Sequence, residues 1–245
     1  MEPRLFFYVN LVLCALVFVE VLFTFRKNAL LKVYFLLIIG SLFAMNYFAC
    51  TGVTTRFLFI LAISMRIMYV CSTILAIIHL VHAKIPRWFI WFVALSVPFI
   101  IGIRLYYYDQ IDIEKLSQLP NQVFTVGAEF YTPKTAARYA IIALAITAII
   151  ITWYYYRQFL MRVNRESPYY KQVTRWIISL VIPFFLLTIF GILGNLGMFS
   201  QTASSYLFSF FNCFIMFSFL LRPRILNTRS YLEINNMTNL GVSIK

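Results

Sequence analysis

Seven long apolar stretches, separated mostly by short polar connections, use up almost the whole of this 245-residue chain. A helix needs about 20 consecutive apolar residues to cross the hydrocarbon core of a bilayer. The sequence therefore predicts an all-α polytopic membrane protein, a seven-transmembrane helix bundle that leaves no room for a soluble catalytic domain. The expected spans are residues 5–25, 33–49, 57–81, 88–106, 139–156, 176–199 and 203–221.

The composition excludes the common soluble classes. Hydrophobic residues make up 62% of the chain and charged residues only 12%, whereas a soluble domain carries about 25% charged residues. The net charge of +13 has the sign of a nucleic-acid-binding protein, but the low charged fraction excludes such a domain and also an ordinary soluble enzyme. The basic excess is therefore assigned to the membrane surface, and no nucleic acid is expected to contact this segment.

The basic residues are divided unequally between the two sides of the predicted membrane. One side receives fourteen Lys and Arg against two acidic residues, and the other receives six against five. By the positive-inside rule the first side is cytoplasmic. The N-terminus is then expected outside and the C-terminus in the cytoplasm.

One transmembrane domain, residues 1–226, accounts for most of the chain, and residues 227–245 are expected to be a cytoplasmic tail or a truncated linker. The predicted outer loop 107–138 is long and partly apolar, so it is interpreted either as a cap over the bundle or as a plain linker. The inner loop 157–175 is basic, and it is expected to set the topology and to contact anionic membrane lipids.

Glu20 and Arg66 are the two Asp, Glu, Lys or Arg residues that fall inside the predicted spans and away from the outer helix ends. A charge in hydrocarbon is costly unless it is paired or faces a cavity. Their depths differ by about 8 Å at the helical rise per residue, a gap that two long side chains can bridge. Two interpretations stay open: an intramembrane ion pair that determines helix register, or Arg66 as the anchor of an anionic or polar ligand entering from outside.

Further polar residues are expected in the outer halves of other spans, beneath the long outer loop. Together with Arg66 they are predicted to line an outward-facing ligand pocket: Asn46, Arg104, Arg138 and Asn195. Arg104 and Arg138 fall at helix ends, where snorkelling to the lipid headgroups explains them without any ligand.

No catalytic residue, metal site or cofactor is predicted. His79 and His82 have an i, i+3 spacing, but their span contains no Asp or Glu to complete a metal site. The outer half of the predicted bundle has no histidine to serve as a catalytic base, and no glycine-rich phosphate loop is present. The cysteines have no paired spacing and are expected to be packing residues: Cys14, Cys50, Cys71 and Cys213.

The last span leaves the membrane through a short basic, proline-containing stretch, Leu221-Arg-Pro-Arg-Ile-Leu226. With the seven-span layout, this exit resembles the seven-transmembrane sensory input modules of bacterial membrane-bound regulators of the histidine kinase or helix-turn-helix type. The resemblance implies a bacterial inner (plasma) membrane protein that signals to a cytoplasmic output domain or partner protein. The motifs of G-protein-coupled receptors and of retinal-binding rhodopsins are absent: the third span lacks the Asp/Glu-Arg-Tyr triplet, and the last lacks lysine.

The leading functional prediction is a membrane sensor or receptor that binds a small or lipidic ligand in its outer half and signals through the seventh helix. A small transporter or channel is the alternative, since seven spans interrupted by prolines are compatible with alternating access. An integral membrane enzyme ranks third, and it would use His79 or His82 at the cytoplasmic face.

Reporter fusions test the predicted orientation. We expect green fluorescent protein fused after Lys245 to fluoresce and alkaline phosphatase fused there to be inactive, because the positive-inside rule places this end in the cytoplasm. Alkaline phosphatase inserted within residues 107–138 should be active and serves as the matched control. An active phosphatase after Lys245 would contradict the orientation.

Overall fold

The computed structural model describes residues 3–24, 29–51, 55–80, 87–106, 136–162 and 201–221, and shorter helical pieces between residues 171 and 189. These residues form helices, and no strand occurs among them. Six helices are long enough to label, in chain order: α1 (Pro3–Thr24), α2 (Ala29–Thr51), α3 (Arg56–Leu80), α4 (Arg87–Tyr106), α6 (Ala136–Arg162) and α8 (Gln201–Leu221). The all-α prediction is confirmed for this part of the chain.

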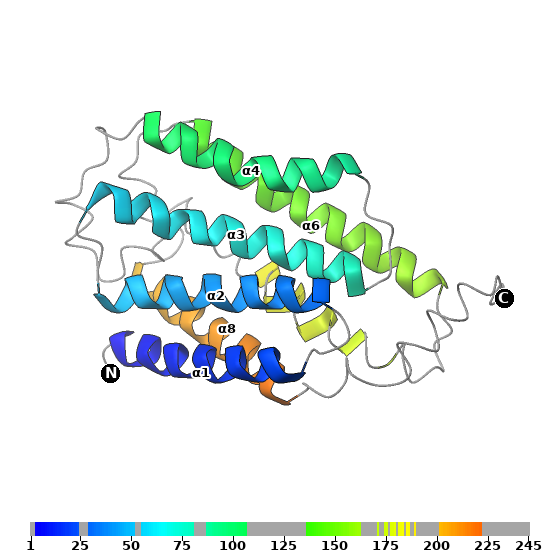
Figure 1. The fold of residues 1–245 in the computed structure, drawn as a ribbon, viewed down its shortest axis with the longest axis horizontal. Helices are drawn as coiled ribbons and strands as arrows, with labels where there is room; N and C mark the ends of the chain where they lie inside the picture. The colour runs from blue at the N-terminus through cyan, green and yellow to red at the C-terminus, as the bar shows by residue number, and fades with distance from the viewer. Residues whose placement is uncertain are drawn as a thin grey trace.

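The helices lie side by side along the long axis of the molecule (Figure 1). α2 packs between α1 and α3, α3 also contacts α4 and α6, and α8 packs against α1. Successive helices from α1 to α4 alternate in direction, and α8 runs parallel to α1. The first and last described helices are therefore neighbours in space.

Three of these helices are long and apolar enough to cross a membrane: Leu5–Phe23 within α1, Ala29–Thr51 and Arg56–Leu80. Within α4 a shorter apolar helix extends over Ile90–Ile103. These lengths and compositions identify the chain as a membrane protein. The count of seven spans and their orientation stay predictions.

The helices extend beyond the apolar stretches that predicted them. α2 begins at Ala29 instead of residue 33, and Lys32 in its first turn donates a hydrogen bond from Nζ to the carbonyl oxygen of Leu22, 2.6 Å away. This ammonium group lies where the last carbonyls of α1 lack partners in their own helix. α6 continues past residue 156 to Arg162. Hydropathy marks the thickness of the hydrocarbon, and a helix can continue into the polar interface beyond it.

Parts of both predicted long loops are consequently helical. Residues 136–138 belong to the first turn of α6 and residues 157–162 to its last turns. The remainder of the predicted outer loop, residues 107–135, and the predicted tail, residues 227–245, lie outside the described part of the chain.

Apolar side chains occupy the surface of the bundle as well as its core. Phe7, Phe35 and Phe59 are fully buried, yet equally apolar residues face outward, such as Val12, whose side chain is 61% exposed. A helix on the surface of a soluble protein would have a polar outer face. An apolar surface is the arrangement that lipid requires.

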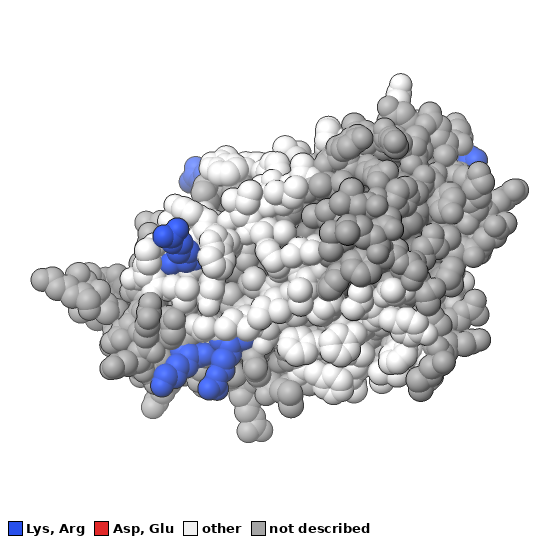
Figure 2. Space-filling model, turned by 180° about the vertical axis from the view of Figure 1, so that it is seen from behind, with Lys and Arg blue, Asp and Glu red and all other residues white. Residues whose placement is uncertain are grey.

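On one face of the bundle, most of the visible Lys and Arg side chains lie at one end (Figure 2). Uncharged side chains cover the middle of the described surface on this face. α2 and α4 begin at this end, and α6 ends there. We call it the basic end, after the Lys and Arg at these helix ends: Lys32, Arg87 and Arg157.

A polar contact joins α1 to α8. The carboxamide of Asn10 on α1 donates from Nδ2 to the backbone carbonyl of Ser209, 3.3 Å away, and its Oδ1 accepts a hydrogen bond from the thiol of Cys213, 2.8 Å away. Both partners lie on α8, one turn apart. We call these three residues the Asn10 clamp. The rings of Phe6 and Tyr206, with centroids 6.0 Å apart, add an aromatic contact between the same two helices.

Cross-linking tests the contact between α1 and α8. In a background with Cys14, Cys50 and Cys71 replaced by Ala, we expect Asn10→Cys to cross-link to native Cys213 under mild oxidation, since the two side chains are in contact. Gel mobility after proteolysis between the helices reads out the linkage. Val12→Cys, on the exposed face of α1, is the control, and equal cross-linking from both positions would contradict the described packing.

Candidate ligand-binding site

Three asparagines are completely buried among the described helices: Asn10 on α1, Asn46 on α2 and Asn212 on α8. Each carboxamide can donate two hydrogen bonds and accept two. In an apolar surrounding a polar group without a partner costs free energy, because no water replaces the missing bond. The hydrogen-bond partners of these three side chains therefore show which buried polar atoms are paired and which are not.

The three side chains differ in how far their polar atoms are paired. Asn10 is bonded at both its nitrogen and its oxygen within the clamp. Asn46 donates to the carbonyl of Leu42 on its own helix, 2.7 Å away, but its Oδ1 has no partner within the described structure. Asn212 has no partner there for either Nδ2 or Oδ1. Asn10 thus has both polar atoms bonded, Asn46 has one, and Asn212 has none among the described groups.

Two buried serines extend this unpaired set. The hydroxyls of Ser41 on α2 and Ser209 on α8 find no partner among the described groups. The usual solution for a hydroxyl in an apolar helix is a bond to the carbonyl four residues earlier, and Ser64 on α3 makes it, donating to Ile60 at 2.7 Å. Ser41 and Ser209 do not make that bond in the described structure, and they leave additional polar atoms for another group to bind.

The unpaired atoms of α2 and α8 lie between the end opposite the basic end and about the middle of the bundle. Counting at about 1.5 Å per residue from the end opposite the basic end, Asn46 is about 8 Å deep, Ser209 about 12 Å and Asn212 about 16 Å. A hydrocarbon core is about 30 Å thick. By the predicted orientation Asn46 and Ser209 thus lie in the outer half, where the sequence places its ligand pocket, and Asn212 lies at the midplane.

The predicted site residues are described to different extents. Asn46 is buried as stated above, and Arg66 on α3 is half-buried, about 15 Å from the same end by the helical rise. Arg104 and Arg138 lie in α4 and α6, but their side chains, like the whole of Asn195, are outside the described residues. The geometry neither joins these five residues into one pocket nor separates them.

The Glu20–Arg66 ion pair also stays a prediction. Glu20 is half-buried near the basic end of α1, and Arg66 lies deeper within the bundle on α3. α2 packs against both helices and lies between them.

The His79 side chain packs against an aromatic ring of α2. Its imidazole lies 6.0 Å from the ring of Tyr34 on α2, centroid to centroid, in a T-shaped contact. His82 falls outside the described residues. Within the described residues, no group of three His, Cys, Asp or Glu side chains is placed to hold a metal ion.

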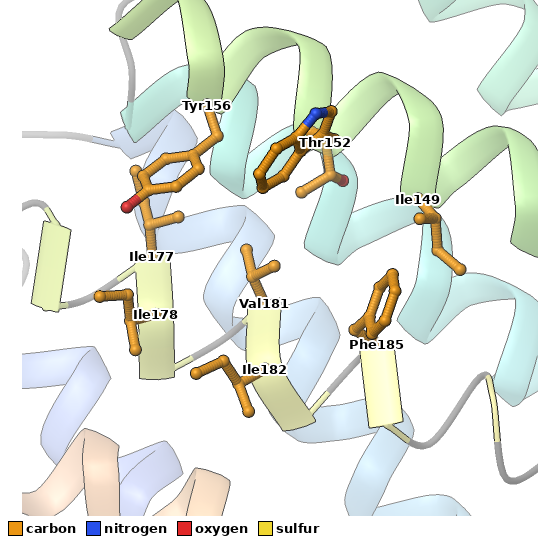
Figure 3. Close-up of a pocket in the computed structure, with 9 residues that line it drawn as sticks. Ile149, Thr152, Tyr156, Ile177, Ile178, Val181, Ile182 and Phe185 are labelled. Carbon is orange, nitrogen blue, oxygen red and sulfur yellow. The ribbon is translucent and has the colours of Figure 1, made fainter. Parts of the chain in front are cut away.

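A cavity of about 580 Å³ lies between α6 and the helical residues from 177 to 185. Figure 3 shows Tyr156 near Ile177 at one end of the cavity, and Phe185 and Ile149 at the other. The sequence analysis did not predict this cavity: none of the predicted ligand-binding residues is among its described lining. Its lining residues are Ile149, Thr152, Trp153, Tyr156, Ile177, Ile178, Val181, Ile182 and Phe185.

Asn212 is the other feature that sequence reasoning undervalued. The sequence shows this residue only as an asparagine inside the apolar span 203–221. Its lack of a partner depends on which residues of other helices face it, and the sequence of α8 alone does not contain that information.

No known family model matches this sequence, and neither a curated protein nor a solved structure shows significant similarity to it.

Substituting two asparagines by leucine tests the difference in pairing. Asn10→Leu should lower the free energy of unfolding by about 0.5–1.5 kcal/mol, since interhelical hydrogen bonds in membrane proteins are individually modest. Asn212→Leu, of similar shape, should leave stability unchanged or raise it by about 1–3 kcal/mol, because it removes a buried group without a partner. Unfolding in mixed micelles with increasing dodecyl sulfate measures both. A loss for Asn212→Leu equal to that for Asn10→Leu would mean that Asn212 is already paired within the protein.

Proposed function

We propose that this protein is a membrane sensor or receptor that binds a small or lipidic ligand in the half of the bundle opposite the basic end. In this proposal it is a multi-pass protein of the bacterial inner membrane, with seven spans, an outer N-terminus and a cytoplasmic C-terminus. The ligand site is formed by α1, α2, α3 and α8, and the response leaves through α8 to a cytoplasmic output domain or partner protein.

The buried carboxamide of Asn212 is the observation that carries this proposal. Both of its polar atoms lack a partner among the described residues, at a depth where water does not compensate. Such a group is expensive as a packing residue, since leucine would fill a similar volume without the cost. A ligand with a hydrogen-bond donor and acceptor side by side, such as a carboxylic acid or an amide, satisfies it.

Two other polar residues of the bundle support a polar or anionic head on this ligand. Asn46 offers a buried acceptor in the same half of the bundle, and Arg66 on α3 offers a guanidinium group at nearly the same depth as Asn212. A guanidinium group binds carboxylates and phosphates through paired hydrogen bonds. The surrounding core is apolar, so the rest of the ligand is apolar as well.

The position of α8 supports signalling through this helix. α8 carries Asn212, and it is held to α1 by the adjacent Cys213 of the Asn10 clamp and by the contact between Tyr206 and Phe6. A ligand that bonds Asn212 in one arrangement of α8 better than in another shifts the population between them. Because α8 ends at Leu221, just before the basic exit stretch, such a shift is passed directly to the cytoplasmic side.

Native mass spectrometry of the full chain in lipid nanodiscs tests the proposal through whatever small molecule the protein retains. We expect a co-purifying small molecule on the wild type that is lost or strongly reduced in Asn212→Leu and in Arg66→Leu. Adding that molecule back should raise the melting temperature of the wild type, by linkage, and leave both variants unchanged. Phe210→Leu, on the exposed face of α8, is the matched control.

Two outcomes would contradict the proposal. Equal retention of the molecule by the wild type, Asn212→Leu and Phe210→Leu would remove Asn212 from the site. Saturable flux of the molecule through proteoliposomes containing the wild type would favour the transporter instead.

A further inference from the structure

The cavity beside α6 differs in chemistry from the polar interior. Its described walls are aliphatic and aromatic, and only Thr152, Trp153 and Tyr156 contribute polar side-chain atoms. Its volume of about 580 Å³ is within the range of about 300–1,000 Å³ that ligand pockets have. A ligand portion that fills this space is therefore apolar.

The cavity opens toward the bilayer. Its floor is closed, since Thr152 and Ile177 are almost completely buried. Its rim is exposed: the Trp153 side chain is 63% accessible, and Ile182 and Phe185 are also on the surface. The helices that form it have apolar outer faces, so the molecules that reach this rim are lipids. We call the cavity and its open side the α6 groove.

Positive charge flanks one end of the α6 groove. Tyr156 and Ile177 mark that end in Figure 3. Arg157 directly follows Tyr156, Arg175 precedes Ile177 by two residues, and both are exposed. The sequence of the two walls, residues 149–162 and 171–189, contains no Asp or Glu. An apolar slot thus runs inward from a positively charged mouth at the basic end.

We propose that the α6 groove is a binding site for an anionic phospholipid, with one acyl chain in the slot and the phosphate at Arg157 and Arg175. An acyl chain fits the shape and polarity of the slot. A phosphate fits the charge of the mouth, where each nearby base contributes about 1 kcal/mol of attraction to an anionic lipid surface. The indole of Trp153 and the phenol of Tyr156 lie at the groove as amphipathic rings do at headgroup level. This proposal does not depend on the polar site at Asn212.

Fluorescence quenching by brominated lipids tests the groove directly. The chain contains four tryptophans, so replacing Trp88, Trp91 and Trp176 by Phe leaves Trp153 as the only reporter. This full-length protein is reconstituted in mixtures of brominated phosphatidylglycerol and phosphatidylcholine with their unbrominated forms. We expect phosphatidylglycerol to quench Trp153 preferentially, which gives a relative binding constant several-fold above one.

Two kinds of variant then separate the mouth from the slot. Arg175→Gln should lower the relative binding constant about five-fold, the effect expected from one nearby base. Val181→Phe, which fills the slot, should abolish the preference, and Ile178→Phe at the rim serves the same purpose if Val181→Phe fails to fold. Arg87→Gln is the matched control, because it removes an exposed charge from the same end but away from the groove walls.

The proposal is overturned if phosphatidylglycerol and phosphatidylcholine quench Trp153 equally in the parent protein. It is also overturned if Arg87→Gln reduces the preference as much as Arg175→Gln does, since the effect would then be one of overall surface charge. An unchanged preference in a folded slot-filling variant would exclude the groove as the site. Asn212→Leu should leave the preference intact, so failure of the receptor proposal and failure of this one are distinguishable.

Discussion

The pairing of buried polar groups is the constraint on which the described arrangement depends, and the Asn10 clamp shows how it acts. Inside hydrocarbon no water replaces a missing hydrogen bond, so a polar side chain must find its partner on a neighbouring helix. Asn10 finds two on α8. Apolar contacts hold many helix orientations about equally well in lipid, and a directional bond selects one of them. The clamp thereby sets α8 against α1.

The same constraint makes buried polar groups without a hydrogen-bond partner energetically costly. Asn212 lies next to the clamp in sequence and is buried as completely as Asn10, yet it has no partner among the described residues. The helix that the clamp positions thus also presents the least satisfied polar group of the described interior. In the proposed receptor, a ligand bound to Asn212 would act on the same turn of α8 as the clamp.

The two proposed sites differ in polarity and in their place along the bundle. Between the end opposite the basic end and the middle of the bundle, α2 and α8 hold unpaired polar atoms, and this region suits a polar group inserted between helices. The α6 groove extends from the basic end, is apolar, and opens to lipid beside Arg157 and Arg175. One proposed site buries a ligand inside the bundle, and the other binds a lipid at its margin.

The sequence by itself determined the solvent and the helical class, because about 20 apolar residues in a row have few alternatives in a membrane. It also marked Asn46 as an interior polar residue. The helix ends at Ala29 and Arg162 were missed, since hydropathy follows the hydrocarbon and not the hydrogen bonds of the backbone. Only the tertiary structure decided that Asn10 is paired and Asn212 is not, and that residues of α6 enclose a cavity with residues 177–185. Hydrogen-bond pairing and the formation of a cavity depend on which faces of sequence-distant helices pack together. The helix faces are almost uniformly apolar, so the sequence does not indicate which of them pack.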